Sequence, residues 1–410
     1  MGGRECGRAV KARGGGAVHQ MAELKKIRVG VLFGGRSSEH EISLRSALTV
    51  MSAMDPARYE VVPIGIGRDG RWYLRADAIR MLTEAAPRLE ALAGGGVEVS
   101  LLPHPAGNSL VEAPGNGQRA ARGADQAAGK RLPGPLDVVF PVLHGSYGED
   151  GTVQGLLELA GIPYVGAGVL GSAVGMDKDI QKRLLRDAGL PVVRYAAVER
   201  WQWREEPARV ANLARALEYP VFVKPNSLGS SVGISKVKTA SALGAALEDA
   251  FAYDRKVLIE AACVGRELEC AVLGNERPKA SIAGEIVIKG RHEFYSYESK
   301  YVDPDGAEVR IPAALTASQT EHLRELACAA FRALGLRGMA RVDFLATPTL
   351  SEIYLNEVNT IPGFTAISMY PKLWEASGLP LGRLIDRLIE LALEENRERA
   401  ALKITYEVKE

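Results

Sequence analysis

Two short runs near the C-terminus carry polar side chains where a buried strand would carry apolar ones. The first reads GMARVDF and the second reads EIYLNEVNTIPGF. Side chains alternate faces along a strand, so Arg341 and Asp343 share one face of the first run, and Glu357 and Asn359 share one face of the second. If the runs pair, these groups converge, and their oxygens suit Mg²⁺ or Mn²⁺ bridging nucleotide phosphates. The alternative is a surface hairpin with solvated charges.

A second polar segment follows a predicted buried strand, VFVKP. Lys224 ends this strand, and Gly229, Ser230, Ser231 and Gly233 follow it. A cation beside a flexible row of backbone N–H donors could hold a phosphate group. The sequence contains no GxxxxGK[ST] motif, so a P-loop fold is not supported.

The segment Gly166–Gly171 matches GxGxxG after the predicted strand IPYV, which would suggest an NAD-dependent oxidoreductase. The acidic residue expected about 20 positions further on is missing, because the next predicted strand reads PVVRYAAV. A lone glycine pattern is a weak signal. The oxidoreductase stays an alternative from a different functional class.

Composition is that of an ordinary globular protein. The chain has 410 residues, of which 47% are hydrophobic and 25% charged, and its net charge is +1. This balance does not favour binding to nucleic acid or to an anionic membrane. The four cysteines form no CxxC pair, as expected of a reduced cytoplasmic protein. The most membrane-like window, 156–176, contains Glu158 and Pro163 and does not read as a membrane span.

Strand and helix patterns alternate along the chain, which predicts the α/β class with a parallel sheet near the N-terminus. In such a sheet the functional loops follow the strand ends. Two loops of this kind are dense in polar groups, GGRSSEHEIS at Gly34–Ser43 and HGSYGEDG at His144–Gly151. Residues 1–20 read as a disordered extension, and residues from about 94 to 135 read as a loose surface insertion.

Taken together, these residues resemble the ATP-grasp superfamily and, within it, the D-alanine–D-alanine ligases, over about Ile27 to Leu402. The matching segments are GGRSSEHEISL, HGSYGEDGTVQG, GMDKD, VKPNSLGSSVGISKV, FYSYESKY, ARVDF, NEVNTIPGFT and ISMYP. The resemblance implies an N-terminal parallel-sheet α/β domain and an ATP-grasp fold of α+β character, with ATP between the last two domains. The expected divisions are 21–166, 167–259 and 260–410, with a lid at about 289–311.

The resemblance also implies a nucleotide site. Lys178 and Lys224 would contact the ATP phosphates, Glu260 and the backbone of 262–264 the adenine, and Glu267 the ribose. Two Mg²⁺ or Mn²⁺ ions would be held by Asp343, Glu357 and Asn359. The residues that the resemblance assigns to ATP are Lys178, Lys224, Ser231, Glu260, Ala262, Cys263, Glu267, Lys300 and Asn356.

The same resemblance assigns residues to the two amino acids. Glu39 would bind the ammonium of the first D-alanine, with Ser230 and Tyr301 hydrogen-bonded to it. His144 would orient the first substrate. The residues assigned to the second half of the reaction are Arg341 and the Gly363 N–H for the tetrahedral oxyanion, and Ser368 with the Met369 backbone for the second carboxylate.

The activity implied is ATP-dependent ligation of two D-alanine molecules through an acyl phosphate, for peptidoglycan precursor synthesis in the cytoplasm. An ester-forming relative that joins D-alanine to D-lactate is the alternative within the superfamily. Family habit suggests a homodimer. Leu228 departs from the family pattern, because many relatives carry a polar residue at that place in the phosphate loop.

Overall fold

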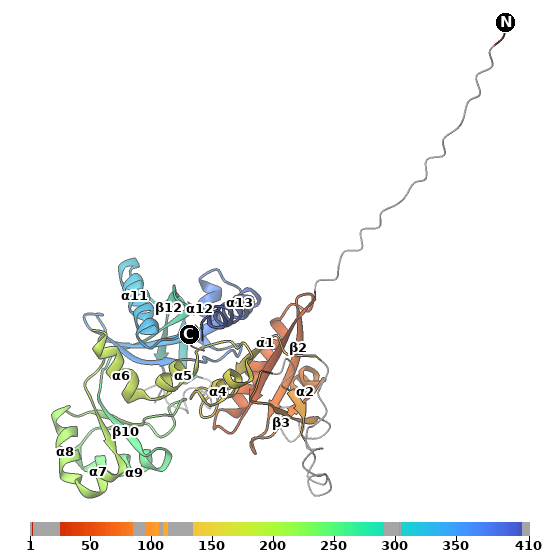
Figure 1. The fold of residues 1–410 in the computed structure, drawn as a ribbon. Coiled ribbons are helices and arrows are strands. Elements are labelled where there is room, and N and C mark those ends of the chain that lie inside the picture. Colours follow the sequence, from red (N-terminus) through yellow and green to blue (C-terminus); the bar gives the residue numbers. More distant parts are fainter. Residues whose placement is uncertain are drawn as a thin grey trace, which may run out of the picture.

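Three β-sheets with flanking helices make up the described part of the chain (Figure 1). The computed structural model describes residues 2, 25–84, 96–105, 110–113, 134–290, 303 and 305–403. Within these ranges, no helix combines the length and the apolar character that crossing a bilayer requires.

The first sheet has the order β5-β4-β3-β2-β1-β6. Its centre is parallel, as predicted, because β1 pairs in parallel with both β2 and β6. Its other edge is antiparallel, since the short connection between β2 and β3 cannot make a parallel crossover. The elements are β1 (Ile27–Gly34), α1 (His40–Ala53), β2 (Tyr59–Ile66), β3 (Trp72–Leu74), α2 (Ala78–Glu84), β4 (Val97–Leu101), β5 (Leu110–Glu112), β6 (Val138–Val142) and α4 (Thr152–Ala160).

The insertion expected over 94–135 is partly ordered, and that expectation was wrong for β4 and β5. These strands pair antiparallel with each other and extend the first sheet. They are only five and three residues long, so the neighbouring glycines and prolines hid their alternation from the sequence pattern. Residues 94–95, 106–109 and 114–133 of the insertion lie outside the described residues.

The second sheet has the order β7-β10-β8-β9 and is antiparallel throughout. Helices α8 and α9 share its apolar core, which includes Val210, Leu247 and Ile259. The elements are β7 (Tyr195–Glu199), α7 (Arg200–Glu205), α8 (Pro207–Ala216), β8 (Val221–Pro225), β9 (Ser235–Val237), the 3₁₀ turn η2 (Ala240–Ala242), α9 (Leu243–Tyr253) and β10 (Lys256–Ala261).

The third sheet, of order β13-β12-β11-β14-β15, is also antiparallel. Helices α5 and α6 precede the second sheet in sequence, yet both contact β15. The elements are α5 (Val169–Met176), α6 (Lys178–Asp187), β11 (Arg266–Gly274), β12 (Lys279–Ile288), β13 (Ala307–Arg310), α11 (Ala317–Ala333), β14 (Gly338–Ala346), β15 (Ile353–Asn359), α12 (Met369–Ala376) and α13 (Leu381–Ala400).

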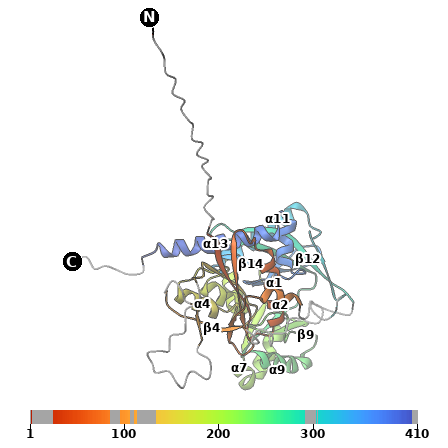
Figure 2. The same cartoon turned by 90° about the vertical axis from the view of Figure 1, so that its right-hand side faces the viewer.

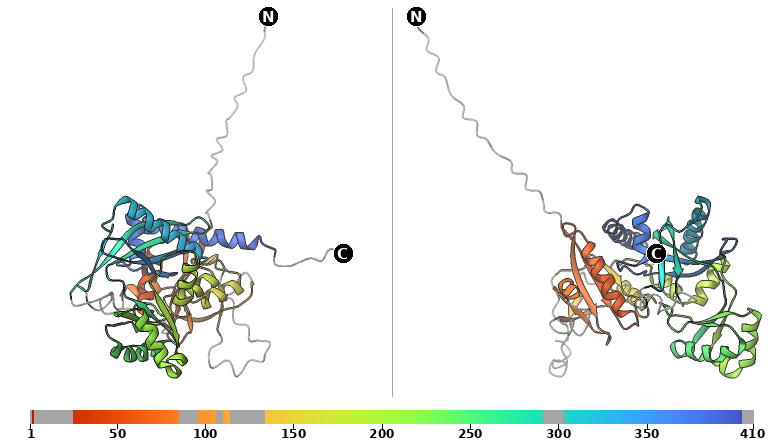
Figure 3. Two further views of the ribbon diagram at one scale, coloured as in Figure 1. Left: turned by 90° about the vertical axis from the view of Figure 1, so that its left-hand side faces the viewer. Right: turned by 180° about the vertical axis from the view of Figure 1, so that it is seen from behind.

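The first and third sheets share one apolar core. Helix α13 contacts both β6 and β14. It lies near β14 in the turned view of Figure 2, and the same arrangement is drawn from two further sides in Figure 3. Its buried face follows helical spacing through Leu384, Ile385 and Leu388. Phe364 packs edge-on against Phe140 of β6, with ring centroids 5.9 Å apart. The segment that follows β15 is therefore fixed against the first sheet.

The expected boundary between 259 and 260 falls inside β10, which belongs wholly to the second sheet. We propose that the division lies instead in the connection between β10 and β11, because each strand there pairs with a different sheet.

Candidate active site

The polar runs of β14 and β15 pair antiparallel, as their alternation predicts. Arg341 lies opposite Asn359, and Asp343 opposite Glu357. Arg341 donates to both Asp343 oxygens at 2.7 Å, and Asn359 Nδ2 donates to Asp343 at 3.0 Å. The Asp343 side chain is only 12% exposed, which rules out a solvated surface hairpin.

Glu269 on β11 extends this polar face and was missed from the sequence. It lies opposite Asp343 across the ladder, and its carboxylate is 3.0 Å from Arg341 Nε. Burial alone would lower the pKa of Arg341, but the Asp343 and Glu269 carboxylates raise it well above its ordinary range. Glu269, Asp343 and Glu357 form a row of carboxylates across three neighbouring strands, with Arg341 as a permanent cation among them.

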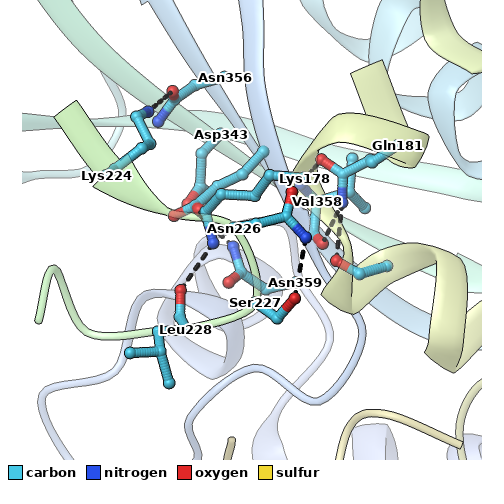
Figure 4. Close-up of polar contacts among 12 residues, drawn as sticks. Lys178, Gln181, Lys224, Asn226, Ser227, Leu228, Asp343, Asn356, Val358 and Asn359 are labelled. Atoms are coloured by element: carbon cyan, nitrogen blue, oxygen red, sulfur yellow. Dashed lines mark hydrogen bonds and ion pairs between the residues drawn. The ribbon is translucent and has the colours of Figure 1, made fainter. Parts of the chain in front are cut away.

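Helix α6 places Lys178 beside this row (Figure 4). The Lys178 ammonium donates to the Leu228 carbonyl at 2.7 Å and lies 3.3 Å from a Glu357 oxygen. The helix begins at Lys178 because the Asp177 side chain caps it by accepting the Ile180 N–H. A candidate phosphate-binding cation and a candidate metal ligand are thus neighbours.

The side chain of Gln181 fixes α6 against β15. Its amide group donates to the Val358 carbonyl at 3.1 Å and accepts the Val358 N–H at 3.0 Å (Figure 4). This two-way bond holds the helix in register with the strand that carries Glu357.

The loop after Lys224 brings the second sheet to the first. Ser230 and Ser231 both have left-handed backbone conformations, with φ of 51° and 57°, which is unusual for residues with a Cβ. Ser230 Oγ donates to a Glu39 oxygen, so the expected hydrogen bond between them is present. The phosphate loop therefore reaches the polar loop that follows β1.

Lys224 and Glu260 lie together, and Glu260 has a different environment from the one expected. Its carboxylate is 2% exposed and lies 2.6 Å from the Lys224 ammonium. The other Glu260 oxygen is 3.2 Å from Lys182, a residue that sequence analysis did not select. Asn356 accepts a hydrogen bond from Lys224 at 3.5 Å (Figure 4).

The connection from β10 to β11 carries the remaining residues expected at the nucleotide. The Ala262 N–H donates to the Pro220 carbonyl at 3.3 Å, which ties this connection to the start of β8. Cys263 is partly buried there, and Glu267 lies one residue into β11. These positions lie between the second and third sheets, because β10 and β11 belong to different sheets.

A cavity of about 450 Å³ lies where the first and third sheets and the phosphate loop meet. It brings together nine residues that the resemblance assigns to the substrates or the metal ions. Glu149 and Glu269 also line it and were not assigned. The nine are Glu39, His144, Ser230, Arg341, Glu357, Asn359, Gly363, Ser368 and Met369.

His144 joins the first sheet to the segment after β15. Its Nδ1 is 3.1 Å from the Ile361 carbonyl, which can only accept, so Nδ1 carries the proton. Its unprotonated Nε2 accepts from the Ser46 hydroxyl at 3.1 Å, and Ser46 Oγ in turn accepts the Phe364 N–H at 3.2 Å. Burial lowers the pKa of His144. A neutral, fixed imidazole suits orientation of a substrate better than acid catalysis.

Gly363 and Ser368 are neighbours at the other end of the cavity. Ser368 Oγ accepts the Thr365 N–H at 3.0 Å, which folds the turn before α12. A Cβ on Gly363 would stand 2.8 Å from Ser368 Oγ, closer than van der Waals contact allows. A residue with a Cβ at this position would therefore displace the Ser368 hydroxyl.

Glu149 is buried between two loops of the site. Its oxygens accept the N–H groups of Gly145 at 2.6 Å and Ile361 at 3.2 Å. Burial, together with the nearby Glu39 charge, raises the pKa of Glu149 to about 8. At neutral pH without substrate, the Glu149 carboxyl is therefore largely protonated.

This pKa predicts a pH effect on stability that a Glu149→Gln variant removes. The pKa of Glu149 in the folded protein lies above its ordinary value of 4.5. The stabilising contribution of the protonated carboxyl is therefore fully present below pH 4.5. It is lost as pH rises through about 8. We expect the melting temperature of wild type to fall relative to Glu149→Gln across this window in thermal scans. Parallel curves for the two proteins would contradict the prediction.

Lys300 and Tyr301, which the resemblance places in a lid, lie outside the described residues, as do the other positions of 291–302. The strands on either side, β12 and β13, pair with each other from Glu285 to Ile288.

The donor set on β14 and β15 fits a divalent ion that arrives with a nucleotide. Asp343, Glu357 and Asn359 offer two carboxylates and an amide. Magnesium is commonly held by one or two carboxylates and completed by phosphates and water. Within the described residues, no three His, Cys, Asp or Glu side chains form a metal site by themselves. Phosphate oxygens near Lys178 would complete the coordination.

Known proteins and protein families match this chain along most of its length. The family model described as D-ala D-ala ligase N-terminus matches residues 28–167, and that described as D-ala D-ala ligase C-terminus matches residues 184–390. The chain is 50% identical over 377 residues to D-alanine–D-alanine ligase A of Chromobacterium violaceum, covering 92% of this chain and 98% of that one. It is 45% identical over 382 residues to D-alanine–D-alanine ligase A of Escherichia coli, covering 93% and 100%.

Solved structures are similar as well. The D-alanine–D-alanine ligase from Coxiella burnetii gives a TM-score of 0.75 at 39% identity, covering 92% of this chain and 97% of that one. The VanG D-Ala:D-Ser ligase from Enterococcus faecalis gives a TM-score of 0.76 at 35% identity, covering 90% and 100%.

Proposed function

The chain belongs to the D-alanine–D-alanine ligase family, and we propose that it joins two D-alanine molecules in the cavity between its first and third sheets, through an acyl phosphate. The enzyme is an ATP-dependent ligase that makes D-alanyl-D-alanine for peptidoglycan synthesis. The observation that carries the proposed mechanism is the meeting of Glu39, Arg341 and Ser368 around one cavity.

In the first half-reaction, Glu39 holds the ammonium of the first D-alanine while His144 orients this substrate. The carboxylate of the first D-alanine is a poor electrophile and must be activated. One of its oxygens attacks the γ-phosphorus of ATP, which forms the acyl phosphate and releases ADP. Lys178 and Lys224 screen the charge that develops on the phosphates. The short distance between Lys178 and Glu357 supports this arrangement, because it places both beside the same polar row.

In the second half-reaction, the amine of the second D-alanine attacks the acyl carbon and phosphate leaves. The Arg341 guanidinium and the Gly363 N–H stabilise the tetrahedral oxyanion. Ser368 and the Met369 backbone bind the second carboxylate. The positions of Arg341, Gly363 and Ser368 around the cavity support these roles.

Asp343, Glu357 and Asn359 would hold two Mg²⁺ or Mn²⁺ ions. When bound, such ions neutralise phosphate charge and act as Lewis acids on the transferred group. The Arg341 guanidinium forms ion pairs with the carboxylates of Asp343 and Glu269. These buried carboxylates therefore keep a cationic partner when no nucleotide is bound.

We place Lys300 and Tyr301 on a lid that excludes water from the acyl phosphate, as the family resemblance implies. Glu260, Ala262, Cys263 and Glu267 are assigned by the same resemblance to the adenosine part of ATP. Cytoplasmic location and a homodimer are further parts of the proposal.

A Tyr301→His variant should shift the product from dipeptide toward the ester with D-lactate. The neutral phenol of Tyr301 does not repel the ammonium of a second D-alanine. A protonated imidazole at this position would repel that ammonium and would attract the carboxylate of the second substrate. The ester share should grow as pH falls. Competition of D-alanine against D-lactate across pH, with products resolved by mass, measures the shift. A wild-type enzyme that makes mainly ester at neutral pH would overturn the assigned specificity.

The oxidoreductase alternative is not favoured by the comparisons. The glycine motif at Gly166–Gly171 leads into α5, but Tyr164 before it forms only an isolated bridge with Val139. A strand followed directly by a phosphate-binding turn is therefore missing.

One experiment tests the proposed reaction. The protein is incubated with ATP, Mg²⁺ and D-alanine, and the products are identified by mass. One dipeptide and one ADP per cycle are expected, and D-alanyl phosphate should be trapped as a hydroxamate when hydroxylamine is added. ADP release without dipeptide would contradict the ligation, and no ADP release would contradict the whole proposal.

A further inference from the structure

A buried cluster of charges joins three parts of the fold behind the phosphate loop. It consists of Lys182 on α6, Lys224 on β8 and Glu260 on β10, with Asn356 on β15 beside them. The Glu260 carboxylate lies 3.2 Å from Lys182 and 2.6 Å from Lys224. Lys182 also donates to the Asn356 carbonyl at 2.9 Å. Each Glu260 oxygen thus faces one lysine.

The three side chains differ in how far they reach the surface. Lys182 is 1% exposed and Glu260 3%, whereas Lys224 is 9% exposed and ends the strand that leads into the phosphate loop. Burial alone would raise the pKa of Glu260, but the two lysines hold it below its ordinary value. Burial lowers the pKa of Lys182, whereas the Glu260 carboxylate opposes that change. Because Lys182 lies 3.2 Å from the Glu260 carboxylate and donates to the Asn356 carbonyl, we count the cluster as two cations and one anion.

We propose that Glu260 is a positioning residue for Lys224 and that buried Lys182 supplies the surplus positive charge that lets Lys224 attract the ATP phosphates. Glu260 alone would hold Lys224 in place but would also neutralise it. Lys182 offsets the Glu260 charge without reaching the nucleotide. This inference rests on the proposed function and gives Glu260 a second role beside its proposed contact with adenine.

The test changes the net charge of the cluster while keeping side-chain size. Lys182→Met lowers the charge by one, and adding Glu260→Gln to it restores the original value. Binding of ADP and of adenosine is measured by calorimetry for both variants and for wild type. We expect Lys182→Met to weaken ADP binding about tenfold, leaving adenosine binding unchanged. The double variant should recover most of the ADP affinity.

Two further measurements separate this role from a structural one. The KM for ATP should rise in Lys182→Met while kcat changes little, since Lys182 does not touch the reacting atoms. Asp386→Asn is the control, because it removes a carboxylate that pairs with the partly exposed Arg58 and touches no member of the cluster, so it should leave both affinities unchanged.

A Glu260 that serves adenine alone would give a different pattern. The double variant would then bind ADP no better than Lys182→Met does, which overturns the inference. Equal loss of ADP and adenosine binding in Lys182→Met would do the same. Absence of ADP binding in wild type would instead count against the proposed function itself.

Discussion

A Glu357→Gln variant is expected to lose about 10²- to 10³-fold in kcat while keeping its fold. The substitution keeps the volume and removes one charge from the row of Glu269, Asp343 and Glu357. It also weakens the contact to Lys178, which lies 3.3 Å away. Initial rates of ADP release at saturating D-alanine, with Mg²⁺ varied, measure the loss.

The matched control is Glu375→Gln, which removes an exposed carboxylate from α12. It should turn over as wild type does. The Glu357 variant should also need a higher Mg²⁺ concentration for half-maximal rate, because one hard ligand is weaker. Wild-type turnover at ordinary Mg²⁺ would exclude Glu357 from the site.

An Arg341→Lys variant should lose about 10²-fold or more in kcat although the positive charge is kept. The guanidinium donates to both Asp343 oxygens at 2.7 Å and lies 3.0 Å from Glu269. An ammonium cannot make this forked contact and cannot also point at the oxyanion. The KM for ATP should change much less than kcat, because Arg341 acts after the nucleotide has bound.

Arg387→Lys is the control for this change. Arg387 makes a comparable two-point contact with Glu394 on the surface of α13, at 2.8 and 3.2 Å, away from the cavity. Its replacement should leave kcat unaltered. Equal kcat values for Arg341→Lys and wild type would show that guanidinium geometry is not required for the reaction.

The shared face of Asp343 and Glu357 could be predicted because strand alternation is a local rule that needs no knowledge of the rest of the fold. The pairing of β14 with β15 then followed from their closeness in sequence. Glu269 obeys the same rule, alternating with Leu268 and Cys270, and this signal was available. The sequence does not show that β11 pairs with β14, which places Glu269 opposite Asp343 although the two are 74 positions apart.

Lys182 could not be predicted for a related reason. On an amphipathic helix, a lysine four residues after Lys178 reads as a solvated charge. Its burial depends on β10 and β15, which reach it from distant parts of the chain. The raised pKa of Glu149 could not be predicted for the same reason, because it depends on how closely the loops at Gly145 and Ile361 approach each other.

The apolar core shared by the first and third sheets has a consequence for how the molecule loses its structure. Strands near both ends of the chain bury the same side chains, whereas the second sheet has a core of its own. We therefore expect two cooperative units on unfolding. One unit contains Glu39, Arg341 and Ser368, and it is held together by packing between strands near both ends of the chain. Lys224 belongs to the other unit. ATP, by contacting both, would couple their opening, so that nucleotide protects the middle of the chain from amide exchange.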